Sequence, residues 1–136
     1  EDGIRDSSTS RGLGDVYKRQ VEKRSGRATE NGIVESYIHT GGRIGSIVQL
    51  SCETDFVART DDFTKCAKEI AMQVAAMNPK AISKDDDNDL SDDEILESQA
   101  YIRDASKTVG EVVKELSAKV GENIVIMKIH RFEIGS

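Results

Sequence analysis

"IVESYIHTGGRIGSIVQLSC" (33–52) is the stretch that determines the fold. It contains two runs rich in β-branched residues on either side of Gly41 and Gly42. Such an arrangement predicts a β-hairpin, because glycine adopts the positive φ angles of a tight hairpin turn at little cost. The second run alternates apolar and polar side chains, which predicts a half-buried strand. Its buried face would consist of Ile44, Val48, Leu50 and Cys52.

The residues after the hairpin predict a long helix that begins at Thr60. Thr60 is a good N-cap, and the two aspartates that follow it suit the positive end of the helix dipole. The helix would end before Pro79, the only proline in the chain. Apolar residues recur along it at spacings of three and four and form one stripe: Phe63, Cys66, Ala67, Ile70, Val74 and Met77.

Two capping boxes predict two further helices. Ser91 with Glu94 predicts a short helix that ends near residue 98, and Thr108 with Glu111 predicts a longer one. Gly121 stands where a glycine would end the longer helix. The apolar face of that helix would consist of Val109, Val112, Val113, Leu116 and Val120. The run "NIVIMKIHRFEI" (123–134) predicts a final strand.

The predicted order is therefore β-β-α, an acidic linker over 80–93, and α-β. We expect one α+β domain over residues 21–136, with a three-stranded antiparallel sheet covered by helices. Residues 1–20 mix serine, glycine and charge without an apolar period. We expect them to be a disordered tail or a non-native linker, and we leave them out of the domain.

Composition excludes several classes of function. The net charge is −6, and nine acidic against three basic residues between 80 and 104 account for all of it. An acidic chain is a poor candidate for nucleic-acid binding. Two cysteines fourteen residues apart suggest neither a zinc site nor a disulfide framework. Without an apolar run of about 20 residues or a signal peptide, we expect no membrane partner and a cytoplasmic or plastid stromal location.

Two ligand-binding motifs are incomplete. Asp85, Asp87 and Asp89 match the first positions of an EF-hand loop, but Leu90 and Leu96 replace its glycine and its final glutamate. We therefore expect a solvated linker and no metal site. "GGRIG" (41–45) lacks the Gly-Lys-Ser/Thr of a phosphate-binding loop, so its glycines are expected to form only the hairpin turn.

A thiol enzyme is an alternative function. It would need Cys52 or Cys66 beside His39 or His130. Both cysteines fall on apolar faces of predicted elements, where a free cysteine is usually a small buried hydrophobe. We therefore expect a protein that is not an enzyme and that needs no cofactor.

"TDFVAR" (54–59) joins the hairpin to the long helix and contains one of only three phenylalanines. Thr54 can cap a short helical turn, and Thr60 caps the long helix six residues later. Two caps so close together predict a kinked corner. The pattern leaves two interpretations of Phe56 open, a plug in the core or a side chain that points outward to a partner.

Four blocks of the sequence resemble the elongation factor Ts family, in its short form with one copy of the core domain, as found in some bacteria and plastids. The blocks lie between Lys23 and Ile134 and read "VESYIHTGGRIG", "CETDFVAR", "EIAMQVAAMNPK" and "SKTVGEVVKELSAKVGENIVI". The resemblance implies a β-β-α(n)-β fold with an antiparallel sheet. It also implies a guanine-nucleotide exchange factor that binds elongation factor Tu and promotes GDP release.

The resemblance further implies that Thr54, Asp55, Phe56 and Val57 contact the GTPase near its magnesium and phosphate site. Phe56 would act there as a wedge. This chain differs from the family pattern because residues 1–20 stand in place of an N-terminal three-helix domain, and because a longer helical insertion after "MNPK" is absent. An alternative is therefore a truncated module that docks without efficient exchange. A single core copy without an internal repeat also implies a possible homodimer.

Overall fold

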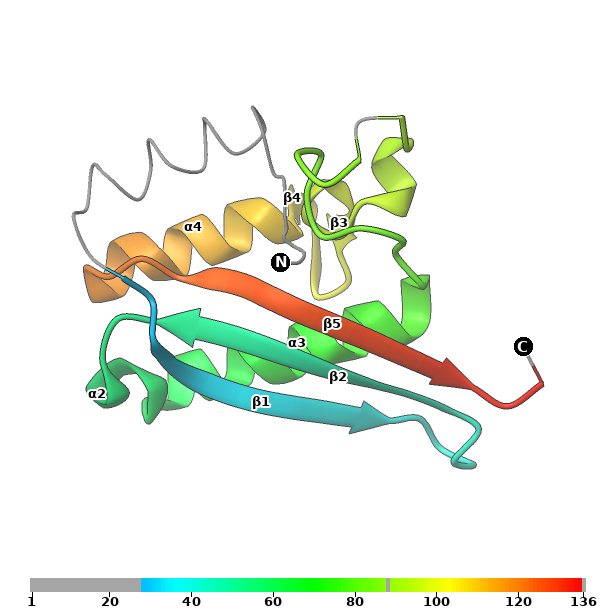
Figure 1. Ribbon diagram of the computed structural model, residues 1–136, viewed down its shortest axis with the longest axis horizontal. Helices are drawn as coiled ribbons and strands as arrows, with labels where there is room; N and C mark the ends of the chain where they lie inside the picture. Colours follow the sequence, from blue (N-terminus) through cyan, green and yellow to red (C-terminus); the bar gives the residue numbers. More distant parts are fainter. Residues whose placement is uncertain (1–27, 88, 136) are drawn as a thin grey trace.

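The computed structural model describes residues 28–87 and 89–135 and confirms the α+β fold (Figure 1). The predicted tail over 1–20 and the first residues of the predicted domain lie outside the described residues. Three strands form an antiparallel sheet in the order β1-β2-β5, namely β1 (Asn31–Ile38), β2 (Ile44–Cys52) and β5 (Val125–Glu133). The helices are α2 (Asp55–Ala58), α3 (Asp61–Met77) and α4 (Val109–Val120).

The hairpin between β1 and β2 confirms the role of the two glycines. Gly41 and Gly42 have φ angles of 99° and 71°. The backbone N–H of His39 donates to the carbonyl of Ile44 at 2.8 Å and closes the connection. The connection covers residues 39–43, so it is longer than a two-residue hairpin turn.

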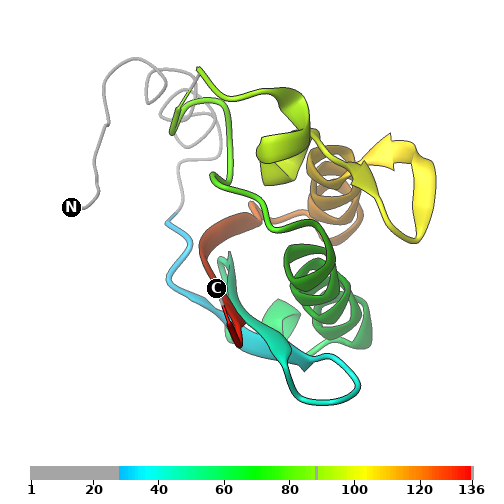
Figure 2. The same cartoon turned by 90° about the vertical axis from the view of Figure 1, so that its right-hand side faces the viewer.

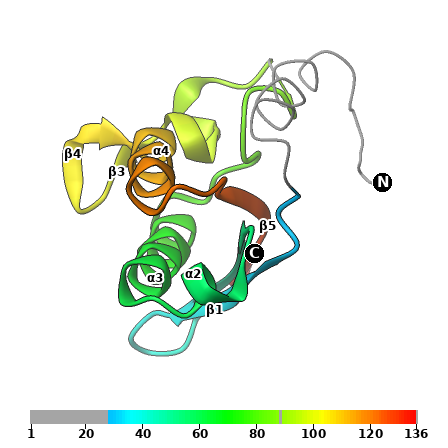
Figure 3. The ribbon, with the colours of Figure 1, turned by 90° about the vertical axis from the view of Figure 1, so that its left-hand side faces the viewer.

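The helices cover one face of the sheet. Figures 2 and 3 show α3 and α4 on the same side of the three strands, with α3 lying along the sheet. The hydroxyl of Ser46 donates to the carbonyl of Ala71, and the guanidinium of Arg131 donates to the carbonyl of Ala75 at 2.9 Å. These side chains on β2 and β5 therefore attach the sheet to α3. No described helix covers the opposite face.

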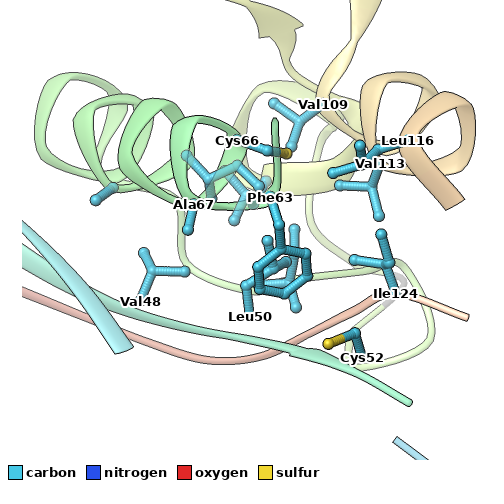
Figure 4. Close-up of a cluster of buried hydrophobic side chains, with 14 of the residues drawn as sticks. Val48, Leu50, Cys52, Phe63, Cys66, Ala67, Val109, Val113, Leu116 and Ile124 are labelled. Atoms are coloured by element: carbon cyan, nitrogen blue, oxygen red, sulfur yellow. The ribbon is translucent and has the colours of Figure 1, made fainter. Parts of the chain in front are cut away.

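The core lies between β2, α3 and α4 (Figure 4). Phe63 is fully buried near its centre, together with most of the stripe predicted along α3. Met77 differs from that prediction, since it lies in the last turn of α3 and is 45% exposed. Thr60 and Thr108 cap α3 and α4 as predicted, and Gly121 ends α4 with a φ of 74°.

The short helix expected after Ser91 is not an α-helix. Two 3₁₀ turns form instead, η1 (Asp92–Glu94) and η2 (Leu96–Ser98), with Ile95 in an extended conformation between them. Ile95 and Leu96 are both fully buried. Ile95 also pairs with Ala81 in a parallel bridge. The extended backbone of Ile95, held by this bridge, keeps the two turns from joining into one helix.

The segment after these turns contains a small two-stranded sheet that the sequence did not predict. It consists of β3 (Ala100–Tyr101) and β4 (Asp104–Thr108). The side-chain amide of Gln73, on α3, donates to the side chain of Gln99 at 3.1 Å and to the carbonyl of Ala100 at 3.0 Å. Its oxygen accepts from the N–H of Ile102 at 2.9 Å. The fully buried Gln73 thus attaches the small sheet to α3.

We expect Gln73→Met to lower the free energy of unfolding by about 2 kcal/mol, because it removes three hydrogen bonds of a fully buried side chain, one of them to the buried Gln99. The measurement is urea unfolding followed by circular dichroism. Gln49→Met is the matched control, since Gln49 is only partly buried on β2. A Gln73 variant as stable as the control would show that the hydrogen bonds do not hold the small sheet in place.

Candidate functional site

The corner between β2 and α3 is built from two successive N-caps, as the sequence predicted. The hydroxyl oxygen of Thr54 accepts from the N–H of Val57 at 3.3 Å and caps the single turn of α2. Thr60 then accepts from the N–H of Phe63 at 3.3 Å and donates to the carbonyl of Val57 at 2.8 Å. Thr60 therefore joins the end of α2 to the start of α3. The two helices meet at a fixed kink.

The corner places Phe56 in solvent. Its side chain is 82% exposed, whereas its neighbours Val57 and Ala58 are 4% and 1% exposed. Successive helical positions are about 100° apart, so Phe56 lies about 150° around the turn from the mean direction of Val57 and Ala58. The interpretation of Phe56 as a core plug is therefore wrong. Val57 has its side chain inside the core, where a partner cannot reach it without opening the turn.

Two acidic residues at the corner, Asp55 and Asp62, pair with nearby bases. The carboxylate of Asp55 accepts from Nε of Arg59 at 2.6 Å, on the exposed side of α2. Asp62, at the start of α3, pairs with Lys119 of α4 at 2.6 Å. The hydrogen bond from Lys119 and its charge lower the pKa of the Asp62 carboxyl. Because both members of each pair are exposed, we expect each pair to contribute little to stability.

The structure does not bring a thiol and an imidazole together. Cys52 is buried on the covered face of the sheet, at the end of β2 farthest from His39 in the hairpin connection. His130 lies opposite Ile47 on the face that no described helix covers. Burial raises the pKa of the Cys66 thiol to about 12 and also raises that of Cys52. Neither cysteine has the low pKa or the adjacent base of a catalytic nucleophile.

The acidic linker forms no recognisable metal site in the part of the chain that the structure describes. No group of three His, Cys, Asp or Glu side chains there could hold an ion. Asp86 instead accepts from the backbone N–H groups of Ile82 and Ser83 at 3.3 and 3.2 Å.

Among residues 28–87 and 89–135, no helix is long and apolar enough to cross a membrane.

Comparisons with known proteins identify the family. The model of the family "Elongation factor TS" matches residues 17–94, more than half of the chain, and its match begins slightly before Val21. The chain is 43% identical over 147 aligned residues to elongation factor Ts of Caldanaerobacter subterraneus subsp. tengcongensis, and the alignment covers 83% of this chain and 74% of that relative.

Two further relatives agree. Elongation factor Ts of Thermoanaerobacter sp. (strain X514) is 42% identical, with 83% of this chain and 72% of the relative covered. Elongation factor Ts of Rippkaea orientalis is 38% identical, with 85% and 60% covered. Because 83% of 136 residues is fewer than the 147 aligned positions, the Caldanaerobacter relative contains residues that this chain lacks. On these matches and on its fold, the chain belongs to the elongation factor Ts family.

Proposed function

We propose that this protein is a guanine-nucleotide exchange factor that binds elongation factor Tu and promotes the release of GDP. Membership of the elongation factor Ts family supports a role in translation elongation. The observation that supports the site most directly is the 82% exposure of Phe56 on a turn whose next two residues are buried. A turn whose backbone is already fixed by caps loses little further conformational freedom when its side chain binds.

The four corner residues have different roles in this proposal. Phe56 is the side chain that enters the GTPase. Asp55 lies beside it at the exposed start of α2. Thr54 fixes the start of the turn by capping it, and Val57 anchors the turn in the core. Phe56, Asp55 and Thr54 contact the partner. The buried Val57 does not, and it supports the turn from the core.

Exchange requires a difference in affinity between two states of the GTPase. Magnesium and nucleotide hold the closed state, so a factor that bound both states equally would shift nothing. The Phe56 ring must therefore be buried in the GTPase only in the open state, in which the metal and phosphate contacts have loosened. By reciprocity, the factor weakens nucleotide binding by the same ratio that the nucleotide weakens binding of the factor.

The free energy of burying one ring limits how much Phe56 alone can change the affinity of the GTPase for nucleotide. Burying a phenylalanine side chain contributes about 1.5–3 kcal/mol, or roughly 10- to 150-fold in affinity if the gain occurs only in the open state. Larger accelerations would need the rest of the interface. The metal and nucleotide belong to the GTPase, so the factor itself needs no cofactor and performs no bond-making step. We place its action in the compartment of translation, the cytoplasm or a plastid stroma.

We expect Phe56→Ala to slow GDP release from elongation factor Tu at least tenfold, because truncation removes the central apolar contact. The measurement is displacement of a fluorescent GDP analogue at increasing factor concentration. The thermal unfolding midpoint should stay unchanged, since the ring is in solvent. Met77→Ala is the matched control, because Met77 is also an exposed apolar residue but lies at the other end of α3.

Two outcomes would contradict this proposal. If the Phe56→Ala variant released GDP at the rate of the unmodified protein, the role of Phe56 as a wedge would be overturned. A protein that binds the GTPase measurably but leaves GDP release unchanged would be a docking module without exchange activity.

We propose in addition that a second copy of the chain covers the open face of the sheet. Strand pairing places four large apolar side chains on that face, all between 41% and 68% exposed: Val34, Ile38, Ile47 and Phe132. A sheet face with such an apolar cluster can pack on an identical face about a two-fold axis, as in a β-sandwich.

We expect the unmodified protein to have twice its 14.9 kDa chain mass in size-exclusion chromatography with light scattering. Ile47→Glu should shift it to the monomer, because a carboxylate at the centre of the face would have to lose its hydration when the two faces pack together. Met77→Glu is the control, as Met77 has a similar exposure, 45% against 41%, away from the sheet. A monomeric unmodified protein would exclude this assembly.

A further inference from the structure

We propose that Glu122 is a positioning residue that aims Phe56, an inference that rests on the function proposed above. Glu122 lies in the loop between α4 and β5, 68 residues from Thr54. One oxygen of its carboxylate accepts from the backbone N–H groups of Glu53 and Thr54 at 3.2 and 3.1 Å. The other accepts from the hydroxyl of Thr54 at 2.7 Å. A single carboxylate thus holds the residue that caps α2.

The contact is reciprocal. A carboxylate oxygen of Glu53 accepts from the backbone N–H of Asn123 at 2.5 Å. Each of the two segments therefore presents a carboxylate to the backbone of the other. We call these two contacts, of the Glu122 carboxylate with the backbone of 53–54 and of the Glu53 carboxylate with the backbone of Asn123, the carboxylate clasp.

The loop that carries Glu122 is itself well fixed. Gly121 ends α4 in the left-handed conformation, and its N–H donates to the carbonyl of Ser117 at 2.9 Å. The hydroxyl of Ser117 donates to the carbonyl of Glu122 at 2.5 Å. The carboxylate therefore extends from a rigid helix end toward a turn that needs support.

The need for support follows from the length of α2. A helix of four residues cannot sustain itself, because helix formation has a costly nucleus. Its geometry depends on Thr54, whose hydroxyl has one proton and two lone pairs. Since that proton is donated to Glu122, a lone pair is left facing the N–H of Val57. Glu122 thereby fixes the cap, and the cap fixes the turn that carries Phe56.

The clasp lies at the edge of the fold. The hydrogen bonds that Glu122 accepts are exposed or only partly buried, so water can replace its carboxylate as the acceptor when the side chain is removed. The core below, including Val57 and Ala58, does not depend on them for burial. Loss of Glu122 should therefore make the turn that carries Phe56 more mobile and leave the domain folded. A looser ring must be ordered at binding, which lowers affinity for the partner.

The test is a double-mutant cycle on GDP release, with Glu122→Ala, Phe56→Ala and the double variant. We expect Glu122→Ala to reduce the exchange efficiency about tenfold in the presence of Phe56. In the Phe56→Ala background it should reduce the efficiency only about two- to threefold, because the contacts of Thr54 and Asp55 remain but the ring does not. Glu122→Gln should lie between Ala and the unmodified protein, since its amide oxygen can still accept from the two backbone N–H groups.

A matched control separates positioning from stability. Glu111 accepts the backbone N–H of Thr108 at 2.8 Å and supports the cap at the other end of α4. Glu111→Ala removes a similar bond far from the corner, so it should leave exchange unchanged even if it lowers the unfolding midpoint as much as Glu122→Ala. A second readout needs no partner. Hydrogen–deuterium exchange at the amide of Val57 should be faster in Glu122→Ala and unchanged in Glu111→Ala.

The possible results of the cycle differ in what they overturn. Additive losses would overturn the positioning role, since Glu122 would then act through a contact of its own or through stability. A Phe56→Ala defect without any Glu122→Ala defect would overturn only this inference. No Phe56→Ala defect would remove the proposed function and this inference together. If Glu122→Ala did not fold, the cycle would be run with Glu122→Gln, and additive losses there would likewise overturn the positioning role.

Discussion

The packing of α3 on one face of the sheet is the constraint on which the rest of the structure depends. Phe63 fills the space between β2 and the two long helices, and polar side chains of the sheet donate to the carbonyls of Ala71 and Ala75 farther along α3. Because α3 must begin directly after β2 to place Phe63 there, only a short corner remains between them. That corner has to reverse the chain and close the end of the core at once. Val57 and Ala58 close it, and Phe56 is left in solvent as a consequence.

An exposed phenylalanine is not in itself evidence of function, since isolated apolar side chains are common on protein surfaces. Phe56 differs because its backbone is constrained from several directions. Threonine caps stand at both ends of its turn, and the thiol of Cys52 donates to the carbonyl of Thr54 at 3.1 Å. A ring on such a support can push against a partner rather than bend away from it. In this respect rigidity of the corner matters as much as exposure.

Most of the fold was predictable because its signals are local. The hairpin glycines, the caps at Thr60 and Thr108, and the apolar periods of both long helices each lie within a few residues of the structure they specify. The segment from 80 to 108 was less predictable, since buried Gln73 and the bridge to Ala81 determine its path from a distance. For the same reason the outward direction of Phe56 remained open in the sequence. Glu122 was missed because nothing near it in the chain indicates its contact with Thr54.

The two surfaces proposed for partners lie on different parts of the domain. The apolar sheet face is centred on Ile47, on the side away from α3. Phe56 follows the end of β2, at the corner where α3 begins. A second copy packed on the sheet would therefore leave the ring uncovered, and each copy could engage its own GTPase. Since the strand that carries Ile47 continues directly into the corner, the same element that forms the apolar face also supports the turn.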